Sequence, residues 1–187
     1  IDNGTNDIGN YAQQTLDGGY IIAGTSYSST NANDIRLIKL NVQNGTVSTG
    51  FDSTYNITDG YLNDEAVFVQ EIDHGMGFVI AGNYWASGWG QNNVFVLKTD
   101  YQGTDAMTTI ATFGGGYNDF GNCVQQTRDG GFIIVGSKLS QTTTADDVWV
   151  IKLTYDLSTE WENTYGGDAG DFGNFINQTS DGGYIIT

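Results

Sequence analysis

The sequence predicts an all-β protein made of repeated four-stranded antiparallel units, and three observations support this fold class. An apolar segment preceded by a glycine-containing turn, usually Asp-Gly-Gly, occurs four times. A second segment of the form (D/N)(V/I)x(V/L)(I/L)K follows the first three of these segments. Between them, short apolar stretches are bounded by Gly, Asn and Asp, a pattern typical of strands and tight turns and not of helices.

The copies begin near Tyr11, Phe68, Cys123 and Phe175, at intervals of 57, 55 and 52 residues. Such regular self-similarity indicates a tandem array, so we treat residues 1–187 as about three and a third copies of one unit. The sequence starts without Met and ends inside the fourth apolar segment. We therefore expect it to be a piece of a longer polypeptide.

Each copy is expected to contain four strands, which in the first copy cover residues 11–15, 20–25, 35–40 and, less regularly, 47–55. The link between the first two strands carries Asp17, Asp129 or Asp181 followed by two glycines. Glycine permits the positive φ of a tight hairpin, and the Asp side chain can accept hydrogen bonds from the turn's amides. In the second copy His74 replaces the Asp and Met76 is inserted, so that hairpin should be one residue longer.

The repeat length favours a β-propeller. A β-helix coil uses about 20–30 residues and a four-stranded propeller blade about 40–50, so the observed period fits a blade with long loops. The second and third strands are apolar on both faces, as expected for strands sandwiched between neighbouring blades. A closed ring of six to eight blades would need about 330–440 residues, so this chain would form an incomplete ring.

The combined motifs also resemble a known repeat class. The pattern QxTxDGG(Y/F)IIxG, followed by D(V/I)x(V/L)(I/L)K and by WxxTYGG at residues 161–167, resembles secreted β-propeller repeats of bacteria and archaea. The resemblance covers the whole chain. It implies a propeller fold within a large cell-surface or exported protein, where such repeats serve mostly as scaffolds or binding modules.

The charge excludes some partners. Twenty-two acidic residues against six basic ones give a net charge of −16. Because Lys and Arg hold phosphate backbones and anionic lipids, we expect no nucleic-acid binding. No apolar run approaches the roughly 20 residues of a membrane span, so we expect no membrane insertion. Acidic, Lys-poor repeats rich in Thr, Asn and Gly favour an extracellular or cell-surface location.

Two repeated polar positions are expected to be structural. The third strands end in Lys39, Lys98 and Lys152, and a catalytic lysine is not needed once per blade. We expect these lysines to pair with the repeated carboxylates Asp7, Asp64, Asp119 or Asp171. The first strands carry Gln13, Gln70, Gln125 and Asn177. These amides could line a central channel, but hydrogen bonding from blade to blade is favoured.

The least repetitive feature is an aromatic loop in the second copy that contains Tyr84, Trp85 and Trp89. Its counterparts in the other copies are polar. Flat aromatic side chains could bind a sugar ring or a protein partner at the face where propeller loops gather. Alternatively, they cover the core of their own blade.

No catalytic constellation is visible, so we expect a non-enzymatic module without a cofactor. His74 is the single histidine and has no second ligand residue nearby, and Cys123 occupies a core position. Calcium bound by acidic turns is possible, but no stretch has the spacing of a twelve-residue calcium loop. We expect a scaffold or protein-interaction module that contacts protein partners or other parts of its own polypeptide. Alternatives are a glycan-binding propeller and a fragment of a secreted hydrolase or lyase.

Overall fold

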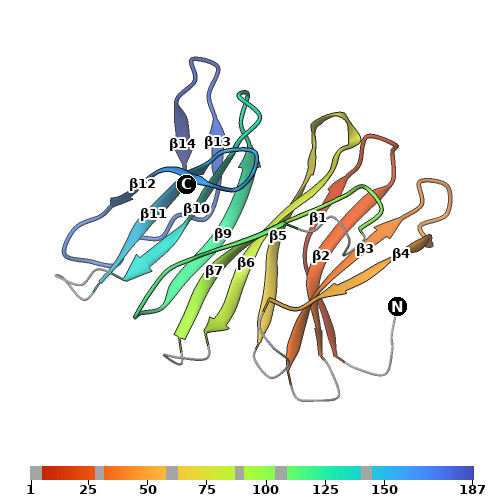
Figure 1. The fold of residues 1–187 in the computed structure, drawn as a ribbon, viewed down its shortest axis with the longest axis horizontal. Helices are drawn as coiled ribbons and strands as arrows, with labels where there is room; N and C mark the ends of the chain where they lie inside the picture. The colour runs from red at the N-terminus through yellow and green to blue at the C-terminus, as the bar shows by residue number, and fades with distance from the viewer. Residues whose placement is uncertain (1–5, 28–31, 58–62, 87–90, 104–108, 140–144) are drawn as a thin grey trace.

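The computed structural model describes residues 6–27, 32–57, 63–86, 91–103, 109–139 and 145–187. These residues form three four-stranded antiparallel sheets and one two-stranded hairpin (Figure 1). Their helical content is a single 3₁₀ turn, η1 (Asp73–Gly75). The prediction of an all-β chain built from four-stranded units is therefore confirmed for the described residues.

The strands of each sheet follow one another in chain order, so each sheet is a simple meander. The first sheet holds β1 (Asp7–Gln14), β2 (Tyr20–Tyr27), β3 (Asn33–Leu40) and β4 (Val47–Tyr55). The second holds β5 (Asp64–Ile72), β6 (Gly77–Ala86), β7 (Gln91–Thr99) and β8 (Thr109–Phe113). The third holds β9 (Asp119–Gln126), β10 (Phe132–Leu139), β11 (Asp146–Leu153) and β12 (Thr159–Tyr165). The hairpin consists of β13 (Ile176–Gln178) and β14 (Tyr184–Ile186).

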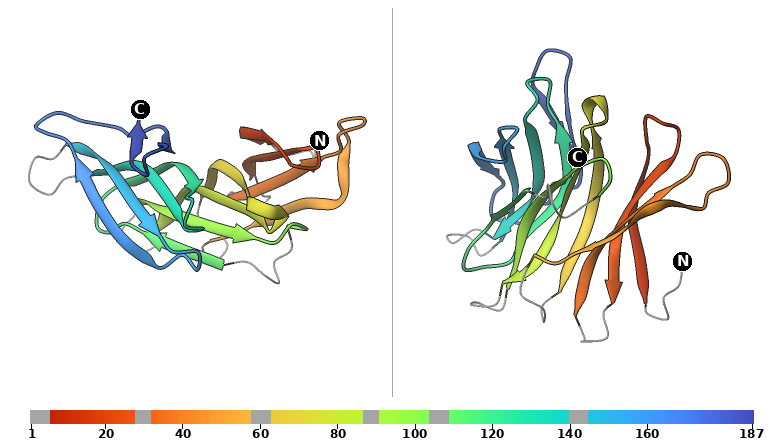
Figure 2. Two further views of the ribbon diagram at one scale, coloured as in Figure 1. Left: turned by 90° about the horizontal axis from the view of Figure 1, so that it is seen from above. Right: turned by 45° about the vertical axis from the view of Figure 1, so that its right-hand side comes forward.

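The three sheets stand side by side and fan apart (Figure 2). The first strands of successive sheets, β1, β5 and β9, contact one another in series, and β13 of the hairpin contacts β9. The fourth strands β4, β8 and β12 form the opposite edges of the sheets. The three sheets cover an arc and do not close into a ring.

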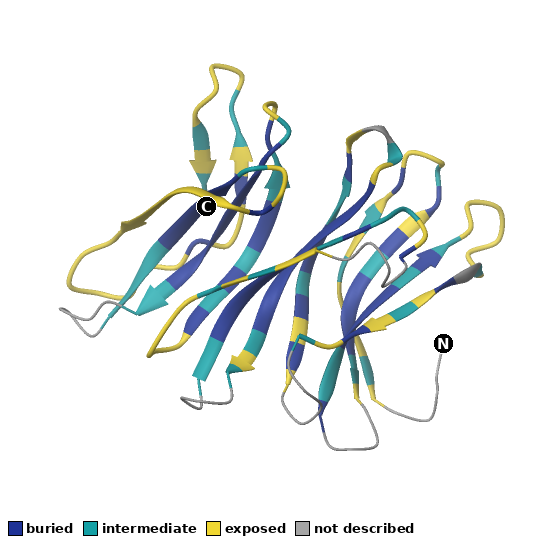
Figure 3. Cartoon of the chain, in the orientation of Figure 1, coloured by how far each residue is buried: buried dark blue, intermediate teal, exposed yellow. Residues whose placement is uncertain are grey.

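Two apolar cores lie between the sheets, and the buried residues gather along the central strands (Figure 3). One core joins the first and second sheets and includes Leu37 and Phe95. The other joins the second sheet, the third sheet and the hairpin, and includes Val96, Cys123 and Ile134. Because β6, β7, β10 and β11 contain runs of consecutive buried residues, both of their faces are covered, as the sequence predicts for central strands.

The glycine that ends each apolar motif has a steric reason. The first strand of each sheet contains a bulge opposite this glycine, at Asn10, Val67 and Asn122. A Cβ added at Gly24 would lie 2.0 Å from the carbonyl oxygen of Ile8, and one at Gly136 would lie 1.7 Å from that of Phe120. The bulged strand therefore approaches too closely for any side chain.

Strand boundaries differ from the predictions mainly at the first strand. In the first sheet it begins at Asp7, four residues before the predicted start, because residues 7–9 continue the pairing with β2 beyond the bulge. The longer second hairpin is confirmed, and η1 occupies its turn. None of the helical structure in the described ranges is long and apolar enough to cross a lipid bilayer.

Candidate functional site

Two of the three repeated lysines, Lys39 and Lys98, link their own sheet to the next one. Lys39 at the end of β3 forms an ion pair with Asp17 at 2.7 Å, and its side chain is 7% exposed. Its ammonium nitrogen also lies 3.7 Å from the ring centre of Tyr101, which follows β7 of the second sheet. The Tyr101 hydroxyl donates to the same Asp17 carboxylate at 2.9 Å. A lysine, a carboxylate and a tyrosine therefore join two sheets.

Lys98 keeps the contact with the next sheet, but in its own turn His74 stands at the repeated Asp position, one residue after Asp73. Its ammonium nitrogen lies 3.6 Å from the ring centre of Tyr155 and donates to the Tyr155 carbonyl oxygen at 2.6 Å. Burial lowers the pKa of Lys98, opposed by the nearby charge of Asp156. The side chain of His74 lies outside the described residues.

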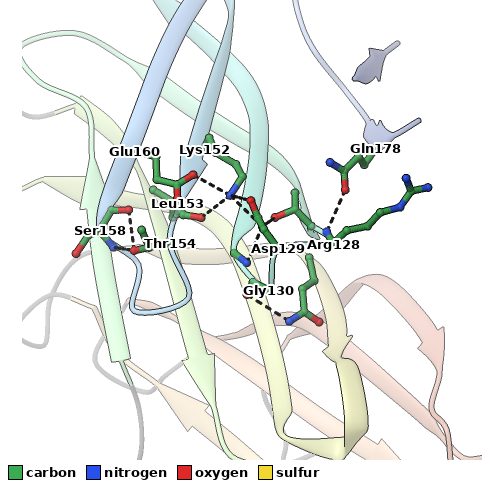
Figure 4. Close-up of polar contacts among 12 residues, drawn as sticks. Arg128, Asp129, Gly130, Lys152, Leu153, Thr154, Ser158, Glu160 and Gln178 are labelled. Atoms are coloured by element: carbon green, nitrogen blue, oxygen red, sulfur yellow. Dashed lines mark hydrogen bonds and ion pairs between the residues drawn. The ribbon is translucent and has the colours of Figure 1, made fainter. Parts of the chain in front are cut away.

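Lys152 forms the most carboxylate-rich of these clusters (Figure 4). Its ammonium nitrogen lies 3.0 Å from Asp129 Oδ2 and 3.0 Å from Glu160 Oε2. It also donates to the carbonyl oxygen of Leu153 at 3.0 Å. The hydroxyl of Thr127, then the amide of Gly131 and the ammonium of Lys152, lower the pKa of Asp129 to about 2 against the opposing effect of burial.

The predicted lysine partners Asp7, Asp64, Asp119 and Asp171 were wrong. In the antiparallel register Gln13 pairs with Ile21 and Ile21 with Lys39, so the lysine lies beside the first turn of its own sheet. Asp7 lies at the opposite end of β1, where it contacts Arg36 instead. Asp64 and Asp119 accept hydrogen bonds from the amides of Ile57 and Gly115. The amide of Asp171 donates to the Asp146 carbonyl oxygen.

The turn aspartates have the local role expected of them. Asp17, Asp129 and Asp181 each accept a hydrogen bond from the amide two residues later, at 3.0–3.1 Å. The glycine after each of these aspartates has a φ between 83° and 91°. These residues therefore build the hairpins, and the first two also hold the lysines.

The repeated amides bond from sheet to sheet. Gln13 Oε1 accepts from the amide of Glu71 at 3.0 Å, and Gln70 Oε1 accepts from the amide of Gln126 at 2.6 Å. Gln70 also donates to Gln125 Oε1 at 3.0 Å. The residue after the repeated amide bonds in the opposite direction. The side chains of Glu71, Gln126 and Gln178 each accept a hydrogen bond from a backbone amide of the preceding sheet. This second set of acceptors was missed in the sequence, although the residues recur at the same spacing.

The aromatic loop is only partly described. Tyr84 is half-buried and packs against the core between the first and second sheets. Trp85 is the second-last residue of β6, and its side chain is 36% exposed. Its backbone amide donates to the Asn63 carbonyl oxygen at 2.9 Å. Trp89 lies outside the described residues. Of the two described aromatic side chains, Trp85 is therefore the one that offers surface to a ligand.

A cavity of about 570 Å³ lies where the linker between β8 and β9 meets the third sheet. Its side chains come from the linker, the end of β10 and the strands β11 and β12, and include Tyr117, Asp119, Lys138, Asp147, Trp149 and Glu162. This cavity is not evident in the sequence, because its lining residues extend over 50 positions, from Gly114 to Thr164, and become neighbours only when the sheet forms.

Trp149 organises one wall of this cavity. Its indole nitrogen donates to Glu162 Oε2 at 3.0 Å, and the Lys138 ammonium lies 4.3 Å from the ring centre. Three carboxylates, those of Asp119, Asp147 and Glu162, face this single lysine around the cavity. The cavity therefore has a negative balance of charge and favours a cationic or hydrogen-bond-donating guest.

Asp119 is the buried acid of the cavity, with 2% of its surface exposed. Burial raises the pKa of its carboxyl group, against the opposing effect of the hydrogen bond from the Gly115 amide. Within the described ranges, no three His, Cys, Asp or Glu side chains are grouped so as to hold a metal ion. A cation here would need amide, carbonyl or water oxygens besides carboxylates.

Comparison with known proteins adds no family to this description. No protein-family model matches the chain, and no curated protein matches it.

Proposed function

We propose that the three sheets are blades of a β-propeller and that the chain is a non-catalytic scaffold or protein-interaction module of a larger cell-surface or exported assembly. One observation carries this proposal: the repeated polar residues are used to hold neighbouring sheets together. Gln70 bonds to Gln126 of the next sheet, and Lys39, paired with Asp17 of its own sheet, contacts the Tyr101 ring of the next sheet. Polar side chains that recur from unit to unit and bond to the neighbouring unit support an architectural role.

The propeller itself can be tested by electron microscopy of the native polypeptide purified from its source. We expect a ring in which these three sheets occupy consecutive positions around a central axis. An open superhelical array with no ring closure would contradict the propeller, while leaving a scaffold role standing.

The non-catalytic role needs a separate experiment. We expect a native protein partner, identified by cross-linking in the source organism, to contact the exposed edges or loops of the sheets. Hydrolysis or elimination of a polysaccharide by the purified native protein, abolished by a point change in this chain, would refute this part of the proposal.

Carbohydrate binding is the second candidate, and the exposed indole of Trp85 favours it. Aromatic faces stack on sugar rings because both present flat apolar surfaces. A glycan panel read by tryptophan fluorescence should then give a response that Trp85→Ala abolishes, while Trp161→Ala, at an equally exposed tryptophan, leaves it intact. A panel without any response, or one that Trp85→Ala leaves unchanged, removes this candidate.

A further inference from the structure

We propose that a hard divalent cation, calcium by the chemistry of its ligands, binds between the second and third sheets at Asn93 Oδ1 and the carboxylate of Asp119. This site lies where the linker after β8 begins, at Gly114. It is independent of whether the sheets belong to a closed propeller.

The two oxygens face one space. A Cβ added at Gly114 would lie 2.4 Å from Asn93 Oδ1 and 2.7 Å from Asp119 Oδ2. The two oxygens are therefore at most about 5 Å apart, and because calcium–oxygen distances are about 2.3–2.6 Å, one ion lying between them can bind both. A side chain at Gly114 would collide with both oxygens, and the φ of 125° at Gly114 disfavours any other residue there.

Asn93 supplies an acceptor that the protein does not satisfy. Asn93 is 7% exposed, and no donor in the described part of the chain reaches its Oδ1. A buried carbonyl oxygen without a partner is destabilising, so native proteins rarely retain one without a bound water or ion. Beside it, the Asp119 carboxylate is almost fully buried. An amide oxygen and a buried carboxylate are the ligand types that calcium prefers.

Between the first and second sheets, which we call the first junction, the counterparts of Asn93 and Gly114 form a hydrogen bond without an ion. Register places Asp34 and Asn56 there, at the positions of Asn93 and Gly114. Asn56 donates its side-chain amide to Asp34 Oδ1 at 3.0 Å. At the second junction Gly114 has no side chain to donate. A cation next to Gly114 would take the place of that donor.

The third junction has the same geometry with two carboxylates. A Cβ added at Gly166 would lie 2.0 Å from Asp147 Oδ1 and 3.0 Å from Asp171 Oδ2. Asp147 Oδ1 also lacks a donor among the described residues. Both Asp119 and Asp147 line the solvent-accessible cavity beside the linker. Calcium takes six to eight oxygens, so water from this cavity would complete the coordination.

The test is calorimetric titration of chelator-treated protein with calcium chloride and, separately, with magnesium chloride. We expect saturable calcium binding. In a chain whose third junction is disabled by Asp147→Asn, the further change Asp119→Asn should weaken this binding by about tenfold or more, because the site at Asn93 loses its charged ligand. Asn93→Asp should tighten it, since it adds a second carboxylate. Glu65→Gln removes one charge from an exposed side chain of β5 and should leave the affinity unchanged.

Several outcomes would overturn the site. These are the absence of saturable calcium binding to the unchanged chain, equal affinity with and without Asp119→Asn in the Asp147→Asn chain, and tighter binding of magnesium than of calcium. Asn93→Asp distinguishes the calcium site from a structure without calcium, in which the Asn93 amide nitrogen turns to donate a hydrogen bond to Asp119. In that case the added carboxylate repels Asp119, lowers the melting temperature and produces no gain in calcium affinity. Circular dichroism of each variant verifies that the sheets still form.

Discussion

Gln70 in the second sheet accepts a hydrogen bond of 2.6 Å from the backbone amide of Gln126 in the third sheet. The same side chain donates to Gln125 at 3.0 Å, so one glutamine serves both a backbone and a side-chain group of its neighbour. Gln13 repeats the backbone contact one sheet earlier, with the amide of Glu71. These bonds join first strands that belong to different sheets, and they therefore resist the separation of one sheet from the next.

The first prediction follows from this contact. Gln70→Ala should lower the free energy of unfolding by about 1–2 kcal/mol, because the Gln126 amide loses its acceptor. The measurement is urea unfolding followed by tryptophan fluorescence. Gln14→Ala is the matched control: Gln14 is exposed, and its side-chain amide donates to the Gly18 carbonyl oxygen within its own hairpin, at 3.4 Å. If the two variants were equally stable, the glutamine contacts would not hold the sheets together.

The second prediction concerns Lys152. Lys152→Met should destabilise the third sheet by about 1–2 kcal/mol. This is less than the loss of one partner from a fully buried ion pair, because Asp129 and Glu160 remain partly hydrated after the change. Their side chains are 58% and 40% exposed. A double-mutant cycle with Asp129→Asn should give a coupling energy above about 0.5 kcal/mol. Strict additivity of the two changes would show that the ion pair contributes nothing.

The third prediction uses the pH dependence of Asp129. Its pKa is about 2 in the folded chain and about 3.9 in an unfolded one, so the folded state favours the charged carboxylate. The resulting stability is fully present above about pH 4 and is lost as the pH falls toward about 2. The difference in unfolding free energy between the unchanged protein and Asp129→Asn should therefore be constant from pH 7 to about 5 and shrink below about 4.

Asp168 provides the charge-matched control for this experiment, since it is an exposed carboxylate in the linker before β13. Asp168→Asn should change the unfolding free energy by less than about 0.5 kcal/mol at each pH. A difference for Asp129→Asn that stayed constant down to pH 2 would contradict the lowered pKa.

The fourth prediction concerns the contact of Lys98 with Tyr155. Tyr155→Leu should destabilise the protein by about 0.5–1 kcal/mol through loss of the cation–π contact, and Tyr155→Phe should retain most of it. Thermal unfolding of the two variants, monitored by circular dichroism, makes the comparison. Equal losses in both variants would assign the effect to the tyrosine hydroxyl and not to the ring.

Local patterns in the sequence determined the repeat, the strands and the turns. The Asp-Gly-Gly turns form as predicted because Gly18 adopts a positive φ and Asp17 accepts the amide two residues later, and both effects act over a few bonds. Apolar residues on both faces of β6 and β10 likewise predicted that other sheets cover these strands. What these patterns imply about blade closure and function remains a proposal.

Only the tertiary structure decided which polar groups meet. The predicted carboxylate partner of the lysine in the third strand was wrong, because sequence spacing does not reveal at which end of the sheet a residue lies. Antiparallel register brings Lys39 beside Asp17 and leaves Asp7 at the far end. Asn93 and Asp119 belong to different sheets, and a linker that turns at Gly114 brings them together. Such neighbours depend on register and sheet packing, which set long-range contacts that local sequence does not encode.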